Sequence, residues 1–421
     1  MGWLNLIKIS IIKYLYDQIF YFNSLITDNI SFKSDIMKIL FIGARLYHGV
    51  ADYVQEKGII SIMSESNPDS PNLKLPNKVH IVPRGMDAPM ELAIKEDVDA
   101  VLPLIGIDGP LMDVGKMKNV LEKEYGIPVV ASNEFAASMA TSKIKTKEFF
   151  TKNKINTPDY QIISNSENSD KIHNSEFLAS KSSKIKFPCV LKQSEGQGGV
   201  GIMVAKNKED VENYFQKYDG AIIEQFIDGF EISVEVLRWN GKSVPLAVVC
   251  KGKTTLKGLH PLDKIKYAPA DICGLSNELA IDLALKITNL MGSEGNTDVD
   301  MIFEPSSGKL YAIEMNTRPS GTRYLTAASS DINPLNEMVD MALGKWDVND
   351  VKNRMKNYYS LEIPVGEFKG PNCDNSSQNF RGFDSWVVHG PKNYERVTIR
   401  GKDQKSTYKT AEMLKIDLNK F

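Results

Sequence analysis

The residues best suited to chemistry lie in a dense run of glycines that follows a lysine. The segment KQSEGQGGVG occupies residues 192–201. Closely spaced glycines let backbone N–H groups approach phosphate oxygens that larger side chains would keep away. Lys192 ends a predicted strand, Cys189–Lys192, and directs a cation toward the same position. The segment therefore predicts a phosphate-binding loop.

A second interpretation of these glycines is a dinucleotide-binding fold. Gly196, Gly198 and Gly201 fit the pattern G-x-G-x-x-G, and Glu224 follows at a spacing suited to a ribose-binding acid. That pattern requires a helix directly after the glycines, whereas Gly201 precedes the β-prone run Ile202–Ala205. The sequence therefore favours the tip of a hairpin, as in the glycine loop of kinases. A Walker A loop is excluded because no Gly-Lys-Ser or Gly-Lys-Thr follows, and a purely structural hairpin is the remaining alternative.

Acidic residues on two neighbouring predicted strands form the second chemical feature. Side chains alternate along a strand, so Glu314 and Asn316 share one face. A five-residue loop between the strands would place Asp300 opposite Glu314, whereas a three-residue loop would place Asp298 there. Facing carboxylates repel each other, and Mg²⁺ prefers one or two such ligands completed by nucleotide phosphates. The pattern predicts a magnesium site.

Other short motifs accompany these two features in a fixed order. Residues 142–147 read SKIKTK and precede an NTP turn, residues 188–192 read PCVLK, and residues 224–231 read EQFIDGFE. With EMNTR at 314–318, this ordered set resembles the ATP-grasp enzymes over about residues 37–345. Ser142 is a departure, because the family pattern D-K-x-x-x-K begins with aspartate.

The resemblance implies an ATP site that uses Mg²⁺, or Mn²⁺ in its place. It implies that Lys143 and Lys192 hold the phosphates. The glycines expected to cover them are Gly198, Gly199 and Gly201. The residues expected around adenine and ribose are Glu224, Gln225, Phe226, Ile227 and Glu231. The expected metal ligands are Asp300, Glu314 and Asn316, and the expected catalytic residues are Arg318 and Lys192.

The resemblance also implies an activity. A substrate carboxylate attacks the γ-phosphate to give an acyl phosphate, which an amine captures to form an amide or peptide bond. Arg318 and Arg323 supply guanidinium groups able to grip carboxylates, which favours a ligase with small-molecule carboxylate and amine substrates. Two alternatives stay open: a carbamoyl-phosphate-synthase-like or carboxylase-like enzyme that phosphorylates bicarbonate, and a nucleotide-binding module without catalysis.

The elements that must position these residues follow two kinds of pattern. Apolar runs alternate with helix-length segments between residues 37 and 142, at 38–42, 59–63, 100–104 and 128–131. This alternation predicts a parallel sheet, and ligands bind beyond the carboxyl ends of such strands. The turns after the first three runs, residues 43–45, 64–68 and 105–108, are therefore candidates for substrate contact.

We expect a mixed α/β and α+β multidomain fold. A Rossmann-like N-terminal parallel sheet precedes a two-lobed ATP-grasp domain. The expected small lobe covers residues 143–222, the large lobe residues 223–345, and a smaller C-terminal element residues 346–421.

Composition limits the partners. The chain has 51 Lys plus Arg against 53 Asp plus Glu, so no global basic field favours nucleic acid. The 4 cysteines lie far apart and predict neither a zinc site nor a disulfide framework, which favours the cytoplasm. Charges interrupt the apolar residues of 1–36, so no stable membrane span is expected there. We interpret 1–36 as an extension before a natural start at Met37, with an amphipathic helix as the alternative. A homodimer is compatible with this composition.

Overall fold

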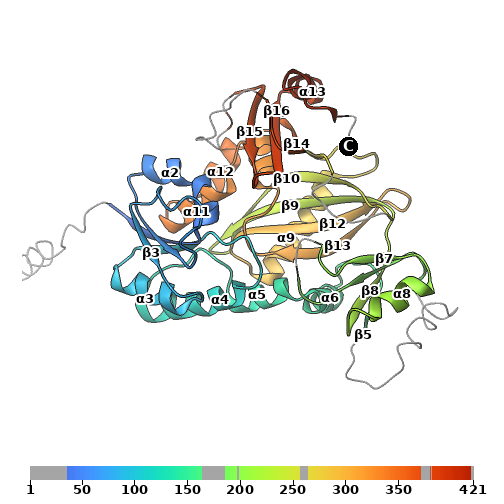
Figure 1. Cartoon of the computed structure of the whole chain (residues 1–421), viewed down its shortest axis with the longest axis horizontal. Coiled ribbons are helices and arrows are strands. Elements are labelled where there is room, and N and C mark those ends of the chain that lie inside the picture. The colour runs from blue at the N-terminus through green and yellow to red at the C-terminus, as the bar shows by residue number, and fades with distance from the viewer. Residues whose placement is uncertain are drawn as a thin grey trace, which may run out of the picture.

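The computed structural model describes residues 36–163, 185–196, 199–256, 264–370, 380 and 382–418. The extension predicted over residues 1–36 lies outside the described residues, apart from Ile36. Figure 1 shows a parallel sheet and a small antiparallel sheet at opposite ends of the long axis, with a large sheet between and above them. No helix in the described part of the chain is long and apolar enough to cross a membrane.

The N-terminal sheet is parallel throughout, as predicted. Its strands, in the order β3-β2-β1-β4, are β1 (Lys38–Ile42), β2 (Ile60–Glu65), β3 (Lys78–Ile81) and β4 (Ala100–Pro103). The run at 128–131 forms no full strand and contributes only a parallel bridge between Val129 and Val101. Strand β3 escaped prediction because its sequence KVHI mixes polar and apolar residues and its side chains are half-buried or exposed.

Helices cover both faces of this sheet. Successive side chains along β1 and β4 point to opposite faces of the sheet, so both faces need a covering layer. The helices of this region are α2 (Ala51–Glu56), α3 (Asp87–Lys95), α4 (Leu111–Val120) and α5 (Glu134–Thr141). Leu92 of α3 and Val114 of α4 pack against one face. The other face receives α11 (Pro334–Ala342), which comes from nearly 200 residues further along the chain.

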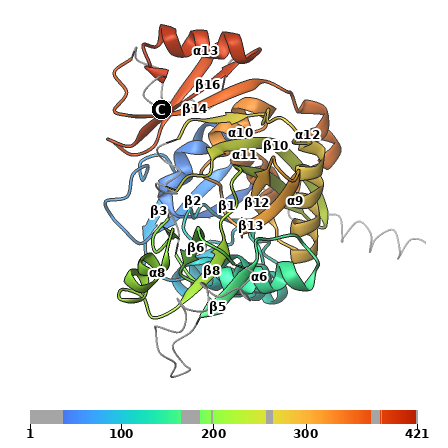
Figure 2. The same cartoon turned by 90° about the vertical axis from the view of Figure 1, so that its right-hand side faces the viewer.

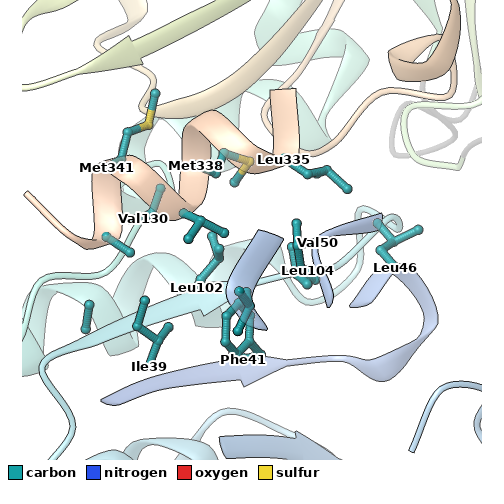
Figure 3. Close-up of a cluster of buried hydrophobic side chains, with 14 of the residues drawn as sticks. Ile39, Phe41, Leu46, Val50, Leu102, Leu104, Val130, Leu335, Met338 and Met341 are labelled. Carbon is teal, nitrogen blue, oxygen red and sulfur yellow. The ribbon is translucent and has the colours of Figure 1, made fainter. Parts of the chain in front are cut away.

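Figure 3 shows this second face, where Leu335 and Met338 of α11 lie over Phe41 and Leu102. Burying a side chain of this size contributes about 1.5–3 kcal/mol. The contact joins the parallel sheet to the rest of the molecule, and so fixes the carboxyl ends of β1 and β2 against the later segments of the chain.

The small sheet is antiparallel and has the order β5-β8-β6-β7. Its strands are β5 (Tyr160–Ile163), β6 (Cys189–Lys192), β7 (Met203–Ala205) and β8 (Ala221–Gln225), with helices α6 (Lys143–Lys152) and α8 (Lys208–Phe215). Because β6 and β7 pair antiparallel on either side of the glycines, the predicted glycine hairpin is confirmed. A dinucleotide fingerprint would instead have a helix after Gly201.

The large sheet has eight strands in the order β13-β12-β9-β10-β11-β14-β16-β15. Its strands are β9 (Phe230–Trp239), β10 (Lys242–Lys253), β11 (Lys266–Ala268), β12 (Gly295–Glu304), β13 (Lys309–Asn316), β14 (Tyr359–Gly366), β15 (Ser385–His389) and β16 (Glu395–Gly401). The accompanying helices are α9 (Asn277–Met291), α10 (Arg323–Ser330), α12 (Val348–Arg354) and α13 (Gln404–Met413). Strand β11 pairs with β14, so the C-terminal strands continue the same sheet. Both views place α13 and β16 at the far side of this sheet from the small sheet (Figures 1 and 2).

Candidate active site

Two lysines meet one buried glutamate on the small sheet. Lys192 Nζ lies 3.0 Å and Lys147 Nζ lies 3.2 Å from Glu224 Oε2. The register pairs Glu224 of β8 with Val190 of β6, so Lys192 lies diagonally across from it on the same face. Lys147 also donates to Thr157 Oγ1 at 2.6 Å. A strand end, a neighbouring strand and a helix thus converge on one charge cluster.

This cluster carries surplus positive charge in a buried place. Burial favours the neutral acid, yet the Lys147 and Lys192 ammonium groups outweigh that effect and hold the pKa of Glu224 below its usual value. Burial lowers the pKa of Lys147 to about 8, in spite of the attraction of Glu224, and Lys192 acts in the same direction. Glu224 Oε1 is buried and accepts no hydrogen bond from the described residues. The cluster can therefore take up an anion beside the lysines and an N–H donor at Oε1.

The glycine hairpin closes over this region. Lys143 begins α6; its backbone N–H donates to Ser194 O at 2.9 Å, and its Nζ donates to Gly196 O at 2.6 Å. Gly201 has φ +72°, and a Cβ there would come within 2.6 Å of Gln193 Cγ. Only glycine fits such a position without strain. Gly199 is described, whereas Gly198 lies outside the described residues.

The connection from β8 to β9 forms a hinge of closely packed backbone. A Cβ on Gly229 would meet Phe303 O at 2.2 Å, so the absence of a side chain lets the hinge touch β12. Thr254 Oγ1 donates to Ile227 O at 2.9 Å and accepts from Gly229 N at 2.9 Å. These bonds fix the backbone of the segment predicted to contact adenine.

Side chains at the two ends of the hinge are anchored as well. Gln225 Oε1 accepts from Lys186 N at 2.8 Å, and its Nε2 donates to Phe226 O at 3.2 Å. Glu231 lies 3.6 Å from Lys264 Nζ. Burial raises the pKa of Glu231, and Lys264 only partly offsets it. A carboxylate in that state gains from hydroxyl donors such as those of a ribose.

The acidic hairpin has the register predicted by the five-residue loop, but for a different reason. Asp300 pairs with Glu314 and Asp298 with Asn316. The loop itself has only four residues, since Glu304 pairs with Lys309. An irregularity between Asp300 and Met301, where Ile313 is the extra residue, restores the pairing. The bulge thus brings the two carboxylates opposite each other.

A lysine of β10 contacts two carboxylates of β12. Lys251 Nζ contacts Asp300 Oδ1 and lies 3.4 Å from Asp298 Oδ2. Burial would lower the pKa of Lys251, but Asp298 and Asp300 raise it well above its usual value. Asn316 Nδ2 donates to Asp300 Oδ2 at 3.3 Å. The face already holds one cation among oxygen ligands.

The predicted ligand set fits a magnesium ion that is completed by phosphates. Burial raises the pKa of Asp300 to about 7, Lys251 lowers it, and the neighbouring carboxylates Asp298 and Glu314 raise it further. A divalent cation would favour the ionised form. No group of three or more His, Cys, Asp or Glu side chains able to hold a metal occurs among the described residues. Asp300, Glu314 and Asn316 would therefore hold Mg²⁺ only together with nucleotide oxygens.

Asp298 has a structural connection instead. Its Oδ2 accepts from Ser320 Oγ at 2.8 Å, and Ser320 Oγ lies 2.8 Å from Thr322 Oγ1. Thr322 in turn donates to the buried Glu235 at 3.2 Å. Burial, reinforced by Asp298, raises the pKa of Glu235 to about 7. This network holds the turn that follows the acidic hairpin.

Arg318 leads from the acidic hairpin into a large cavity. Its Nη2 donates to Asn316 Oδ1 at 3.2 Å and its Nε donates to Asp108 Oδ1 at 2.5 Å. Asp108 belongs to the turn after β4, so the parallel sheet is joined directly to the segment after the acidic hairpin. The cavity beside Arg318 has a volume of about 1330 Å³.

Several regions of the chain line this cavity. The predicted substrate turns do so through Arg45, Glu65 and Gly106, and the C-terminal strands through His389 and Arg396. The five arginines in the lining are Arg45, Arg84, Arg318, Arg323 and Arg396. Glu65 accepts three backbone N–H groups, from residues 44, 66 and 67, and so holds these turns together. The cavity is suited to an anionic ligand.

Sequence reasoning missed several contributors. Lys147 ends the motif at 142–147, but the motif does not show that this lysine is buried beside Glu224. The sequence pattern places Lys251 in a polar loop after a strand that ends at Cys250, whereas β10 continues to Lys253 and Lys251 contacts Asp300 from within it. His389 comes from a strand with no recognisable motif, so only the fold brings it to the cavity.

Known proteins share both this fold and these motifs. A family model described as the ATP-binding domain of the carbamoyl-phosphate synthase L chain matches residues 147–346. A curated relative named carbamoyl-phosphate synthase, from Methanobrevibacter smithii, is 49% identical over 374 residues, covering 88% of this chain and 99% of the relative. The chain therefore belongs to the ATP-grasp enzymes, in the carbamoyl-phosphate synthase family. It is an ATP-dependent ligase that forms C–N bonds and uses ATP with Mg²⁺.

Solved structures with the same fold come from several reactions. The biotin carboxylase domain of the 2-oxoglutarate carboxylase of Hydrogenobacter thermophilus, solved with MgADP and bicarbonate, has a TM-score of 0.70 at 17% identity over 90% of each chain. The L-amino acid ligase of Bacillus licheniformis has a TM-score of 0.68 at 17% identity, covering 91% of this chain and 98% of that one. At this identity the likeness shows the fold and leaves the substrate open.

Proposed function

We propose that this protein is a carboxylate–amine ligase that forms an amide or peptide bond through an acyl phosphate and releases ADP and phosphate. The observation that carries the proposal is the cavity of about 1330 Å³ beside Arg318. Bicarbonate is hardly larger than a few water molecules, each of which takes about 30 Å³. Pockets for small organic ligands are roughly 300–1,000 Å³, so this cavity has room for two substrates.

The site residues have distinct parts in the proposed reaction. The surplus positive charge of Lys147 and Lys192 favours the triphosphate, with Lys143 and Gly199 at the glycine hairpin. Glu224 Oε1, which accepts no hydrogen bond from the described residues, suits the amino group of adenine. Glu231 suits the ribose hydroxyls, next to the hinge backbone. Mg²⁺, when bound by Asp300, Glu314 and Asn316, supplies positive charge to the phosphate oxygens.

Bond formation requires two substrate steps. A carboxylate oxygen attacks the γ-phosphorus, and the bond to the bridging oxygen of ADP breaks. Arg318 and Lys192 stabilise the charge on the transferred phosphoryl oxygens. The amine nitrogen then attacks the acyl carbon, phosphate leaves, and the nitrogen loses a proton. The protein's main contribution is to hold the reactants close together in a fixed geometry.

A bicarbonate-phosphorylating reaction is the second candidate. It is favoured by the family model and by the printed name of the 49% identical relative. In that case the large cavity has to serve a purpose other than holding an organic carboxylate.

A product screen distinguishes the two candidates. The purified full chain is incubated with ATP and Mg²⁺, together with either pooled organic carboxylates and amino acids or bicarbonate with ammonia. We expect ADP, phosphate and an amide product of matching mass in the organic pool. ADP release with bicarbonate alone would support the second candidate, and AMP with pyrophosphate would contradict an acyl phosphate.

A further inference from the structure

The C-terminal strands bring a buried charge cluster to the wall of the large cavity. Glu362 of β14 accepts from Lys266 Nζ at 2.7 Å, and Arg396 Nη1 lies 3.5 Å from the same carboxylate. The side chains of Lys266, Glu362 and Arg396 are 5%, 1% and 17% exposed. Two cations thus share one carboxylate away from bulk water.

His389 adds no charge to this cluster. Burial lowers the pKa of His389 to about 3 in spite of the attraction of Glu362, and nearby cations lower it further. The neutral ring stacks on Tyr324 with ring centroids 4.0 Å apart. Lys266, Arg396, Glu362 and His389 therefore carry one uncompensated positive charge. An unpaired buried charge is costly, and an anion from outside the protein removes that cost.

Polar atoms of the same cluster have no hydrogen-bond partner. Among the described residues, three buried atoms of the cluster make no hydrogen bond, namely Arg396 Nε, His389 Nδ1 and Glu362 Oε2. Arg396 and His389 line the cavity. Buried polar atoms in proteins are nearly always hydrogen-bonded, so these two point to a ligand or ordered water.

Arg323 extends the cluster toward the acidic hairpin. Its guanidinium lies 4.7 Å from the centre of the Tyr324 ring, and its Nη1 donates to Ser320 O at 2.9 Å. Arg323 forms no ion pair with a carboxylate of the described residues, and it lines the cavity. Tyr324 joins the two sides, since its hydroxyl lies 3.1 Å from His48 Nε2.

We propose that Arg323, Arg396 and His389 form a binding site for an additional carboxylate, so that one of the two ligated substrates is a dicarboxylic compound. A carboxylate supplies negative charge and acceptor oxygens to Arg323 and Arg396, which line the cavity. The inference rests on the proposed ligase function, because the other carboxylate of that substrate, or its amine, must reach Arg318.

Binding without nucleotide tests the site by itself. Isothermal titration of the full chain compares glutarate with pentanoate, which has the same chain length and one carboxylate fewer. We expect glutarate to bind at least about tenfold tighter, and Arg396→Gln to abolish that preference. Lys409→Gln removes an exposed cation from α13 of the same C-terminal region and should leave the preference intact. If Arg396→Gln fails to fold, Arg323→Gln on the cavity side of α10 makes the same test.

The outcomes separate the site from the ligase proposal. Equal affinity for glutarate and pentanoate, or tight binding of butyl phosphate with none of glutarate, would overturn the inference. In turnover, glutamate should be ligated with a lower KM than glutamine, and Arg396→Gln should raise the KM of glutamate to that of glutamine. Equal turnover of neutral and acidic substrates overturns the site and leaves the ligase proposal in place. Preferred glutarate binding without ADP release from any organic carboxylate supports the site and contradicts the ligase.

Discussion

Asp300 stands directly opposite Glu314 across the β12–β13 hairpin, and a bulge at Ile313 is what aligns them. Glu314→Gln and Asp300→Asn each keep the side-chain shape and remove one anionic ligand. We expect turnover to fall by roughly 10²–10³-fold in each, as for other losses of transition-state charge stabilisation. Asp298→Asn should cost much less turnover, since an amide oxygen still accepts from Ser320. ATP turnover with Mg²⁺ checks this, and an inactive Asp298→Asn beside an active Asp300→Asn would contradict it.

The lysine beside these acids gives a prediction for the metal-free protein. Lys251→Met leaves Asp298 and Asp300 without their cation, and breaking a buried pair costs about 3–5 kcal/mol. ATP with Mg²⁺ should restore part of that stability, because the metal binds the folded state and supplies the positive charge that the two carboxylates have lost. Melting temperatures in ATP, with and without Mg²⁺, measure this. A magnesium shift no larger than that of the wild type would show that the metal binds elsewhere.

Glu224 serves two lysines, so its removal should be felt in stability and in nucleotide binding. Glu224→Gln leaves Lys147 and Lys192 facing each other, at a cost of about 3–5 kcal/mol. ATP should then raise the melting temperature by more than in the wild type, since the triphosphate replaces the lost countercharge. The matched control is Glu212→Gln on α8, which removes an exposed partner of Lys208 and should change stability by less than about 0.5 kcal/mol. Equal ATP shifts in Glu224→Gln and the wild type would argue against a phosphate role for the lysines.

The buried acid of the C-terminal strands predicts a pH effect. Burial alone would raise the pKa of Glu362, but Lys266 and Arg396 outweigh it and lower the pKa to about 2, against 4.5 unperturbed. A depressed acid pKa adds stability that is fully present above the unfolded value and is lost as the pH falls through the folded value. Wild-type stability should therefore decline between about pH 4.5 and 2, and Glu362→Gln should flatten that decline. Urea unfolding as a function of pH measures both slopes, and parallel curves would contradict the assignment.

Sequence reasoning reached the features that local patterns encode. The glycine hairpin could be predicted because the β-prone Ile202–Ala205 after the glycines is a local signal. Both ends of helix α9 have local signals as well, since Ser276 caps its start and Gly292 ends it in the left-handed region.

Features that depend on distant packing could not be predicted in this way. The alignment of Asp300 with Glu314 was expected from a five-residue loop, whereas a shorter loop and a bulge produce it. Nothing local distinguishes Lys251, inside the metal face, from a lysine at the surface. His389 reaches the cavity only because β11 pairs with β14, a contact between segments about 90 residues apart.

The pairing of β11 with β14 also determines which parts of the site share one sheet. The acidic hairpin, Lys251 and Arg396 belong to one eight-stranded sheet, whereas Lys192, Glu224 and the glycine hairpin belong to a separate four-stranded sheet. A nucleotide bound by residues of both sheets would link the two sheets to each other. Amide hydrogen exchange should therefore slow most in β6, β7 and β8 when ATP binds. Exchange in β12 and β14, which lie inside the eight-stranded sheet, should change little.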